Sequence, residues 1–328
     1  MDMETLFLSH PHQLERQALP PAVMALGYFD GIHLGHQKVI KTAVEAAKER
    51  GYESAVMTFH PHPSVVLGKQ PELRAITPLG KKERLIASLG IDRLYVVEFT
   101  PTFAALAPEQ FVDEYLDGLH VKHVVAGFDF TYGRFGKGTM ETMPIHARGR
   151  FGQTVIPKLV VDGEKVSSTR VRKLLESGDV DQLPRLLGRF YDLEGTVVAG
   201  EQRGRTIGFP TANIALNGDY ILPAVGVYAV KVTVDGNEYE GVANVGYKPT
   251  FHAAREGLPT IEVHLFHFSG DLYGQTLIVE WHRRLRSERK FASVDELAAQ
   301  ITRDKEEAEQ YFRRFNEKTC ILPEKEVF

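Results

Sequence analysis

The sequence has almost no cysteine, the residue that forms disulfides and thiolate metal sites. Its 328 residues include a single cysteine, Cys320, which excludes an intramolecular disulfide and a thiolate-rich metal site and favours a reducing compartment. No apolar run is long enough to span a bilayer. The acidic beginning, from Met1 to Glu4, lacks the basic region of a signal peptide. We therefore expect a cytoplasmic protein without a membrane partner.

The sequence also lacks a large excess of charge of either sign. Its formal net charge is −4, from 39 Lys and Arg against 43 Asp and Glu, which argues against a general nucleic-acid binder. A local basic site for phosphates is compatible with this balance. The length is enough for two domains, each with its own hydrophobic core.

The most informative segment is the turn from Gly27 to His36, which reads GYFDGIHLGH. The apolar run 22–26 before it predicts a buried strand, and apolar residues at helical spacing after it predict a helix that ends near Gly51. Free backbone N–H groups and the dipole at such a helix start favour anions. His33 and His36 are therefore predicted to face a bound phosphate. Local capping by the two rings is the simpler alternative.

Residues 1–184 alternate between segments typical of strands and of helices. Strands are predicted at 22–26, 54–59, 93–98 and 123–126, with helices after the cap Thr77-Pro78 and over 108–116. This order is typical of a parallel sheet in a mononucleotide-binding α/β domain. Ligands of such domains gather at the C-terminal ends of the strands. We therefore expect the HxGH turn to meet the segments FHPHP (59–63) and GFDFTYG (127–133) there.

Residues 185–328 have a different pattern, with short strands predicted at 194–198, 227–234, 239–245, 261–268 and 275–281. The dipeptide Asp-Gly at 235–236 is a hairpin signal, and closely spaced antiparallel strands favour a small β-barrel. Ser293 and Glu296 form a capping box that opens a helix. The apolar stripe of this helix, within 297–315, is expected to pack against the barrel.

Two further segments carry phosphate chemistry. The segment SSTRVR at 167–172 opens a predicted helix, where Ser168 and Thr169 can donate to phosphate oxygens and Arg172 can add a bidentate clamp. Plain N-capping is the alternative.

The segment 200–213 is rich in glycine and ends in Pro-Thr-Ala-Asn. It lacks the Gly-Lys-Ser/Thr ending of a P-loop, but a Thr hydroxyl and an Asn carbonyl suit Mg²⁺. A turn followed by a proline-initiated strand is the alternative.

In this order the motifs resemble the bacterial bifunctional riboflavin kinase/FAD synthetase (FMN adenylyltransferase) family over nearly the whole chain. The resemblance implies a Rossmann-like nucleotidylyltransferase domain over 1–184, which transfers AMP from ATP to FMN and releases pyrophosphate. It also implies a β-barrel riboflavin kinase domain with a terminal helix over 185–328, which makes FMN from riboflavin. The expected cofactor is Mg²⁺ with ATP, and the expected partners are these small molecules and no nucleic acid. An oligomer is compatible with the sequence.

The resemblance also assigns site residues in the first domain. It implies that His33 and His36 stabilise the α-phosphate in the transition state. It implies that the outer phosphates are held by Ser168, Thr169 and Arg172. The further candidates are Gly27, Phe29 and Gly35 for the nucleotide phosphates, and His62 and Asp129 for the flavin or the adenylyl group.

In the second domain, the resemblance implies phosphate contacts from Gly204, Arg205 and Gly208 of the glycine-rich loop. It implies Mg²⁺ ligands at Thr211 and Asn213. The group that takes the proton from the ribityl 5′-hydroxyl is Glu262 by the same resemblance. Because a strand glutamate is usually solvated, Glu280 is kept as the competing candidate.

Several alternatives stay open at this point. The basic run from Trp281 to Lys290 is compatible with a solvated face, with nucleic-acid binding and with a place near the flavin and nucleotide sites. One rival function is a nucleotidylyltransferase that acts on another phosphate-bearing acceptor. The other is a flavin-sensing or RNA-binding regulator that keeps the fold as a scaffold.

Overall fold

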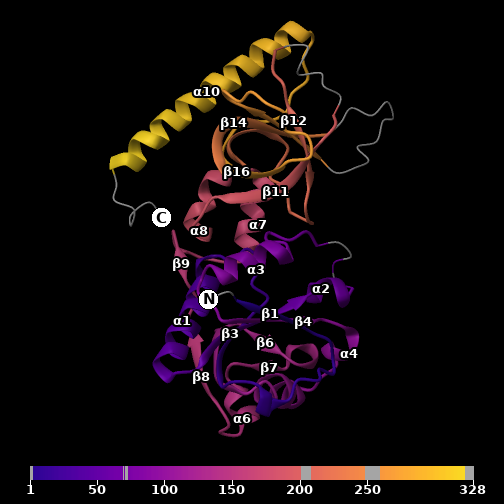
Figure 1. Ribbon diagram of the computed structural model, residues 1–328, viewed down its shortest axis with the longest axis vertical. Coiled ribbons are helices and arrows are strands. Elements are labelled where there is room, and N and C mark those ends of the chain that lie inside the picture. The colour runs from indigo at the N-terminus through magenta and orange to yellow at the C-terminus, as the bar shows by residue number, and fades with distance from the viewer. Residues whose placement is uncertain (1–2, 69, 71–72, 201–207, 248–258, 322–328) are drawn as a thin grey trace. The chain divides into compact units, whose positions relative to one another are not determined.

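The computed structural model describes residues 3–68, 70, 73–200, 208–247 and 259–321. The chain divides into two compact units, Met1–Ser168 and Thr169–Phe328 (Figure 1). The division falls at the first residue of helix α7 (Ser168–Ser177). Our predicted domain boundary, between residues 184 and 185, lies further along the chain.

The first unit is built on a parallel sheet with the strand order β1-β4-β3-β2-β5-β8. Its strands are β1 (Glu4–Leu8), β2 (Ala22–Leu26), β3 (Glu53–His60), β4 (Arg93–Glu98), β5 (Val121–Gly127) and β8 (Gly152–Ile156). All of β2 is buried, as expected for a central parallel strand covered on both faces. The predicted parallel sheet is confirmed. The two edge strands β1 and β8 were not predicted, and only one residue of each is buried.

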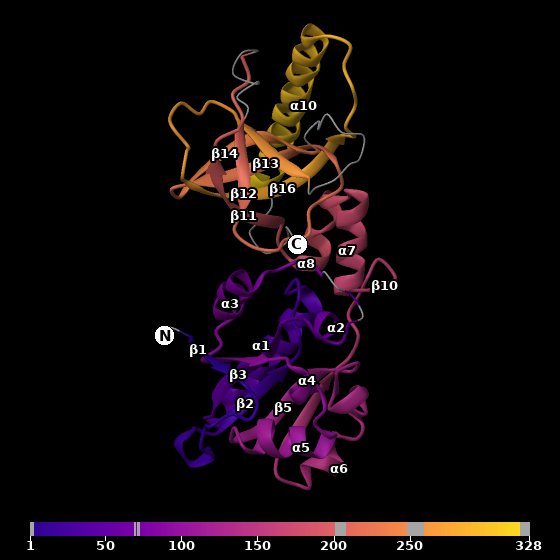
Figure 2. The ribbon, with the colours of Figure 1, turned by 90° about the vertical axis from the view of Figure 1, so that its right-hand side faces the viewer.

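Helices lie on both faces of this sheet (Figure 2), and the two faces carry separate hydrophobic cores. Val23 packs with Ile40 of the long helix on one face, and its neighbour Met24 packs with Phe103 and Tyr115 on the other. The helices of this unit are α1 (Leu34–Arg50), α2 (Pro63–Val66), α3 (Leu79–Ala87), α4 (Pro101–Ala104), α5 (Pro108–Phe111) and α6 (Met143–Ala147), with short 3-10 turns η1 (Arg16–Ala18) and η3 (Arg134–Gly136). Two small ribbons pair β6 (Thr131–Tyr132) with β7 (Gly138–Thr139), and β9 (Val160–Val161) with β10 (Glu164–Lys165).

The strand order reverses between β2 and β5. From β2 the chain adds β3 and β4 on one side of the sheet, and it then places β5 and β8 on the other side. At such a switch point the connections diverge and leave a crevice outside the carboxyl ends of the strands. The turn 27–36 follows β2, and the segment 128–133 follows β5. The topology therefore brings these two predicted segments to the same edge of the sheet.

The predicted start of α3 was wrong by one residue. Pro78 is the N-cap of this helix, and Leu79 is its first residue. Thr77 is buried, and its N–H donates to the Oδ1 of Asp30 at 3.0 Å. This bond to the turn after β2, together with the following proline, keeps Thr77 outside the helix.

The helix predicted over 108–116 is divided. The four residues of α5 are followed by a π-helix, η2 (Val112–Asp117). The N–H of Gly118 donates to the C=O of Asp113 at 2.9 Å, which is the wider spacing of a π-turn. The predicted helical stretch is therefore confirmed in extent, and its second part has π-helical instead of α-helical geometry.

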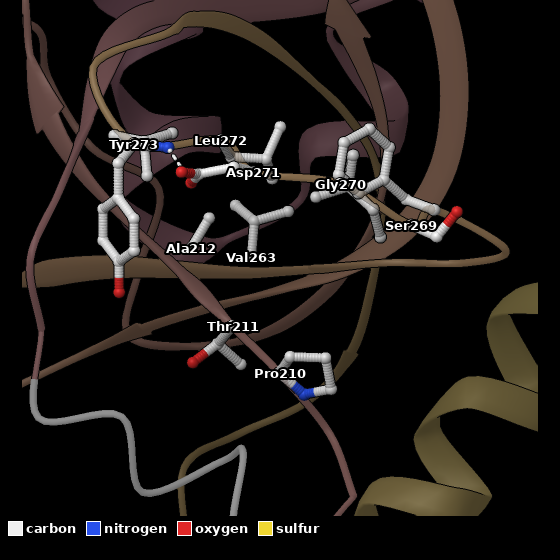
Figure 3. Close-up of a pocket in the computed structure, with 12 residues that line it drawn as sticks. Pro210, Thr211, Ala212, Val263, Ser269, Gly270, Asp271, Leu272 and Tyr273 are labelled. Atoms are coloured by element: carbon white, nitrogen blue, oxygen red, sulfur yellow. Dashed lines mark hydrogen bonds between the residues drawn. The ribbon is translucent and has the colours of Figure 1, made fainter.

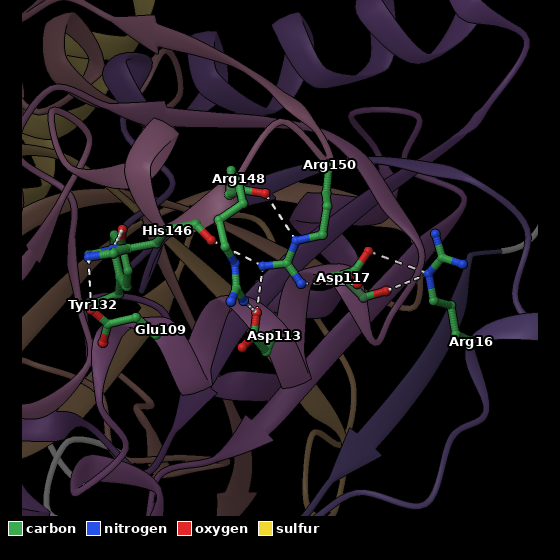
Figure 4. Close-up of polar contacts among 9 residues, drawn as sticks. Arg16, Glu109, Asp113, Asp117, Tyr132, His146, Arg148 and Arg150 are labelled. Atoms are coloured by element: carbon green, nitrogen blue, oxygen red, sulfur yellow. Dashed lines mark hydrogen bonds and ion pairs between the residues drawn. The ribbon is translucent and has the colours of Figure 1, made fainter.

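Ion pairs with distant residues surround the π-helix (Figure 4). Arg148 and Arg150 both pair with Asp113, and Arg150 also pairs with Asp117 at 3.1 Å. The Nε of Arg16 donates to the C=O of Asp117 at 3.0 Å. These contacts join segments that are 33 to 101 residues apart in sequence, so no local pattern could indicate the wider turn.

The second unit contains a closed antiparallel barrel in the order β11-β12-β15-β14-β13-β16 (Figure 1). Its strands are β11 (Tyr191–Val198), β12 (Ala212–Leu216), β13 (Gly226–Val234), β14 (Asn237–Gly246), β15 (Thr260–Leu265) and β16 (Thr276–Arg286). Helix α7, the turn η4 (Val180–Gln182) and helix α8 (Pro184–Leu187) precede the first strand. The predicted barrel is confirmed, and so is its hairpin, because Asp235 and Gly236 both have left-handed φ angles, +46° and +79°.

The C-terminal helix α10 (Val294–Ile321) lies along the outside of the barrel (Figure 1). Its Ala308 and Phe312 are fully buried against Val227, Ala229 and Val242 of the barrel, as predicted. One half of the predicted capping box is present, because the N–H of Glu296 donates to Ser293 Oγ at 3.1 Å. The Glu296 carboxylate accepts the N–H of Ala292 at 3.0 Å instead of that of Ser293.

A buried ion pair fixes α10 to the barrel. The Nε and Nη2 of Arg286 on β16 donate to both carboxylate oxygens of Asp304 at 2.7 to 3.0 Å, and the Asp304 side chain is only 4% exposed. Part of the basic run 283–290 thus has a structural partner.

We expect Arg286→Met to lower the unfolding free energy of the second unit by about 3 kcal/mol, because it leaves the Asp304 carboxylate buried without its cation. Trp281, the single tryptophan of the chain and a fully buried residue of β16, allows urea unfolding of this unit to be followed by fluorescence. The double variant Arg286→Met/Asp304→Leu should regain most of the loss. A cost below about 1 kcal/mol for the single variant, typical of an exposed pair, would contradict this.

Candidate active sites

The turn between β2 and α1 has a backbone that few residues adopt. Phe29, Gly31 and Ile32 have φ angles of +55°, +88° and +41°, a region that costs a non-glycine residue about 1 kcal/mol. Phe29 and Ile32 are each only 1% exposed, so packing holds them there. Strained backbone of this kind is concentrated at functional sites.

The two histidines of the HxGH motif lie ring on ring at the start of α1. Their ring centroids are 3.6 Å apart and their planes differ by 17°. His33 is the N-cap, and its Nδ1 accepts the N–H of His36 at 3.2 Å, so the capping alternative is true of one ring. A Cβ at Gly35 would lie 3.1 Å from Cε1 of His33. A larger residue at this position would therefore crowd the His33 ring.

Burial keeps both rings neutral. Loss of solvent lowers the pKa of His33 to about 4, with Lys165 acting in the same direction. Burial also lowers the pKa of His36 well below its usual value, helped by His33 and Lys82. At neutral pH the two imidazoles are therefore hydrogen-bond donors and acceptors and not cations. Among the described residues, Nδ1 of His36 has no hydrogen-bond partner.

The predicted glycine and phenylalanine of this turn support the histidines from below. The buried ring of Phe29 meets His36 edge-on, with centroids 5.3 Å apart. A Cβ at Gly27 would lie 2.8 Å from the Phe29 ring, so glycine is needed for this packing. The structure thus gives Gly27 and Phe29 a supporting place behind the histidines.

Ser168 reaches the turn within the first unit. Its Oγ donates to the C=O of Asp30 at 2.8 Å, and Asp30 is itself 4% exposed. The first residue of α7 is thereby tied to the turn that precedes α1. Thr169 and Arg172 follow on α7 in the second unit, and their predicted contacts with phosphate stay predictions.

His62 lies beside the turn, and one of its ring nitrogens already accepts a hydrogen bond. Its Nδ1 accepts the N–H of Ser64 at 2.9 Å and caps α2. Its ring meets the ring of Tyr28 edge-on at 4.2 Å between centroids. The FHPHP segment after β3 is therefore in contact with the HxGH turn, as expected.

Asp129 has a cationic partner that the sequence did not reveal. Its carboxylate is 2.5 Å from Nζ of Lys165 on β10, and the same ammonium lies 4.7 Å from the ring centroid of Phe128. Phe128 is 46% exposed. An unpaired carboxylate would repel a phosphate, whereas this pair is neutral as a whole. The segment after β5 thus offers an exposed aromatic ring beside a matched pair of charges.

A buried lysine completes the described part of this site. Lys82 on α3 is 3% exposed, and its Nζ donates to the C=O of Tyr28 at 2.7 Å. Nζ also lies 4.0 Å from the Tyr28 ring centroid. Lys82 was not among the predicted site residues, although its position four residues before the buried Ile86 places it on the inward face of α3.

We expect the first unit to lose stability as the pH falls from about 6.5 to about 4. Protons bind the unfolded His33 in this range but not the folded one, whose pKa is about 4, so folding is favoured above the range and loses about 3 kcal/mol across it. Hydrogen exchange of β2 peptides against pH would measure this. His33→Asn should reduce the slope and leave the part that is due to His36, and an equal slope in that variant would contradict the assignment.

In the second unit, a cavity of about 560 Å³ opens beside β12 and β15 (Figure 3). Its walls include the apolar side chains of Val197, Ala212, Val263 and Leu265, and residues 268–273 cover one side. Thr211 also lines it. Apolar walls with a few polar groups are typical of a site for a flat ring system.

Next to this cavity, three polar residues form a row across neighbouring strands. Asn213 of β12 and Asn244 of β14 both pair in register with Glu262 of β15. Their strand neighbours, such as Ala212 and Val263, are buried in the barrel, so the row lies on the opposite face. Directly paired residues have Cβ atoms about 5 Å apart. An amide, a carboxylate and a second amide are therefore adjacent.

Thr211 joins this row at its β12 end. Its Oγ1 lies 3.5 Å from Oε2 of Glu262. The preceding C=O, of Pro210, is bonded to Nδ1 of His264 at 2.8 Å, which fixes the start of the strand. The PTAN segment therefore begins a strand, as its alternative interpretation predicts, and still presents Thr211 and Asn213 beside a carboxylate.

The competing glutamate lies elsewhere. Glu280 is on β16, which pairs with β11 and β13. Its carboxylate is 2.7 Å from Nε2 of the buried His282. Glu280 is therefore engaged with a core histidine, while Glu262 lies beside the predicted metal ligands. Of the glycine-rich loop, Gly208 has a left-handed φ of +83°, and Gly204 and Arg205 lie outside the described residues.

Two distinct arrangements for phosphate chemistry thus occur on two folds of one chain. One is a histidine pair at a helix N-terminus on a parallel sheet, and the other is a hydroxyl, amide and carboxylate group on a closed barrel. Together they define a two-domain enzyme that transfers phosphorus-containing groups.

Comparison with known proteins is more specific. Residues 15–170 match the FAD synthetase family, and residues 187–312 match the riboflavin kinase family. The bifunctional riboflavin kinase/FMN adenylyltransferase of Bacillus subtilis (strain 168) is 54% identical over 94% of this chain and 98% of its own length. Its counterpart in Listeria monocytogenes is 44% identical over 96% and 100%. The chain belongs to the bifunctional riboflavin kinase/FMN adenylyltransferase family, and its activities are riboflavin phosphorylation and FMN adenylylation.

A solved structure shares the fold. The crystal structure described as a macrolide-efflux protein from Streptococcus pneumoniae has a TM-score of 0.82 and 35% sequence identity, covering 93% of this chain and 98% of that one. That description refers to the other protein. Across the part of the chain that the structure describes, we find no helix with the length and hydrophobicity needed to cross a membrane.

Proposed function

We propose that the two reactions are carried out by the two sites described above, with riboflavin phosphorylated on the barrel and FMN adenylylated at the HxGH turn. The small-molecule partners are riboflavin, FMN and ATP with Mg²⁺, and the compartment is the cytoplasm. The observation that carries the assignment is the presence of two separate donor sets, one in each unit.

In the first unit, His33 and His36 donate N–H groups to the α-phosphate as it passes through its transition state. Neutral imidazoles suit this role, because they need no proton exchange with solvent when the charge develops. The FMN phosphate is already ionised at neutral pH, so in-line attack requires positioning and no general base. The outer phosphates are held by Ser168, Thr169 and Arg172, and pyrophosphate leaves.

The flavin of FMN lies against the segment after β5 in this proposal. The exposed ring of Phe128 offers a stacking face, and Lys165 offers a cation for the FMN phosphate once that phosphate competes with Asp129. His62 and Tyr28 border the same edge of the sheet.

In the second unit, the adenine ring of ATP occupies the cavity of about 560 Å³. Thr211 lines this cavity, and its Oγ1 lies 3.5 Å from Oε2 of Glu262. This contact supports a nucleotide whose phosphates extend past Thr211 to Glu262. Glu262 takes the proton of the ribityl 5′-hydroxyl as that oxygen bonds to the γ-phosphorus. The bond to the β-phosphate oxygen breaks, and ADP leaves.

The donor set at Thr211 and Asn213 fits Mg²⁺ in kind. A hydroxyl and an amide oxygen beside a carboxylate are hard oxygen donors, and Mg²⁺ commonly keeps waters and phosphate oxygens as its other ligands. When bound with ATP, Mg²⁺ neutralises charge on the β- and γ-phosphates.

We expect His36→Ala to abolish FAD formation from FMN and to leave FMN formation from riboflavin within about twofold of the native rate, since only one site loses its donor. Asn213→Ala should do the reverse. Chromatographic separation of the flavins after incubation with riboflavin, ATP and Mg²⁺ measures both products in one sample. A folded single variant that loses both activities would contradict the separation of the sites.

We expect Glu262→Gln to lower kcat for riboflavin phosphorylation by about 10² to 10⁴, the range of a lost general base. Glu280→Gln is the matched control on another strand of the same barrel, and it should keep kcat within about threefold. The reverse ranking would make Glu280 the base. FAD formation from added FMN should be unchanged in both variants and serves as the check of folding.

A further inference from the structure

The ammonium of Lys82 is an unusual group to find inside the first unit. It is 3% exposed, and among the described residues it makes no ion pair with a carboxylate. Its oxygen partners are the C=O of Tyr28 at 2.7 Å and the hydroxyl of Thr58 at 3.5 Å, both of which are neutral. Burying a cation without a counter-charge costs several kcal/mol.

The hydrogen bond to the Tyr28 carbonyl is not a sufficient reason for a buried lysine at this position. The Oγ1 of Thr58 already donates to that carbonyl at 2.8 Å, so the acceptor has a partner without Lys82. A neutral side chain of similar length would fill the same space at lower cost. Burial lowers the pKa of Lys82 to about 8, and Asp30 opposes the shift, so the group still carries its charge at neutral pH. The positive charge itself is therefore the feature that needs a reason.

The surroundings of Lys82 point to an anionic ligand. Tyr28 is the second residue of the HxGH turn, and the charge of Lys82 is close enough to lower the pKa of His36 and of His60. The two histidines of the motif are neutral in the free protein, as argued above from their burial. The histidines therefore bring hydrogen bonds but little charge to a polyphosphate. Lys165, whose charge also lowers the pKa of both histidines, is already paired with Asp129.

We propose that Lys82 is a positioning residue of adenylyl transfer, whose buried ammonium supplies positive charge at the HxGH turn and holds Tyr28 in place for the incoming triphosphate. This inference rests on the proposed site of FMN adenylylation. It adds a charge that the motif itself does not contain. In the bound state the negative charge of the triphosphate offsets the cost of burying the cation.

The test uses the full-length protein with three substitutions. Lys82→Met removes the charge and keeps the length of the side chain, and Lys82→Arg keeps the charge. Lys48→Met, at an exposed position in the last turn of α1, is the control for loss of a lysine. The measurements are kcat and KM for ATP in FAD formation, inhibition of FAD formation by inorganic tripolyphosphate, and riboflavin phosphorylation in the same preparation.

We expect Lys82→Met to lower kcat/KM for ATP by about 10- to 100-fold and to weaken tripolyphosphate inhibition by about 10-fold, in the range of a lost buried charge contact. Lys82→Arg should recover most of both losses, and Lys48→Met should change neither. Riboflavin phosphorylation should stay within about twofold in all three.

Unchanged kcat/KM and unchanged tripolyphosphate inhibition in folded Lys82→Met would overturn the proposal, whatever happens to its melting temperature. If Lys82→Met does not fold, Lys82→Gln carries the same comparison, because it offers a donor to the Tyr28 carbonyl without a charge. Absence of FAD formation in the unmodified protein, with riboflavin phosphorylation intact, would instead refute the proposed function of the first unit.

Discussion

Withdrawal of two imidazole rings from water is the constraint on which the first unit depends. His33 and His36 can be stacked and buried only because the turn before α1 adopts left-handed backbone at Phe29 and Ile32 and has no side chain at Gly35. Burial makes the rings neutral. The positive potential that favours a phosphate at this edge therefore comes from the helix dipole and from lysines. The histidines thus provide hydrogen bonds, and the lysines provide positive charge.

In the second unit, regular strand pairing and not a strained turn positions the polar groups of the candidate site. Its carboxylate, Glu262, lies on the non-buried face of a closed barrel, between two amides that the register of three strands fixes. Here the backbone ladder positions the proposed reacting groups, and the cavity beside Thr211 has the apolar walls that we propose for a ring. One chain therefore combines a site made by a strained turn with a site made by regular strand pairing.

The features that sequence could predict are those encoded locally. The strand, turn and helix around GYFDGIHLGH, the Asp235-Gly236 hairpin and the helix cap at Ser293 each depend on residues within a few positions. The resemblance of the motifs to one family then identified both domains. Features set by distant partners could not be predicted. Lys82 and Lys165 meet the turn and Asp129 only through the fold.

The π-helix illustrates the same limit for secondary structure. The periodicity of residues 108–116 is helical, and the widening at 112–117 coincides with the carboxylates that meet Arg148 and Arg150. The domain boundary and the contacts of Thr169 and Arg172 stay predictions, since helix α7 begins at the division between the units.

The pairing of Asn213, Glu262 and Asn244 across three strands restricts how the barrel can change during evolution. Side chains alternate between the two faces of a strand, so an insertion or deletion of one residue within β12, β14 or β15 would turn its polar residue into the apolar interior. Changes of length should therefore be confined to the connections between these strands, where a lineage can vary its loops without disturbing the reacting groups.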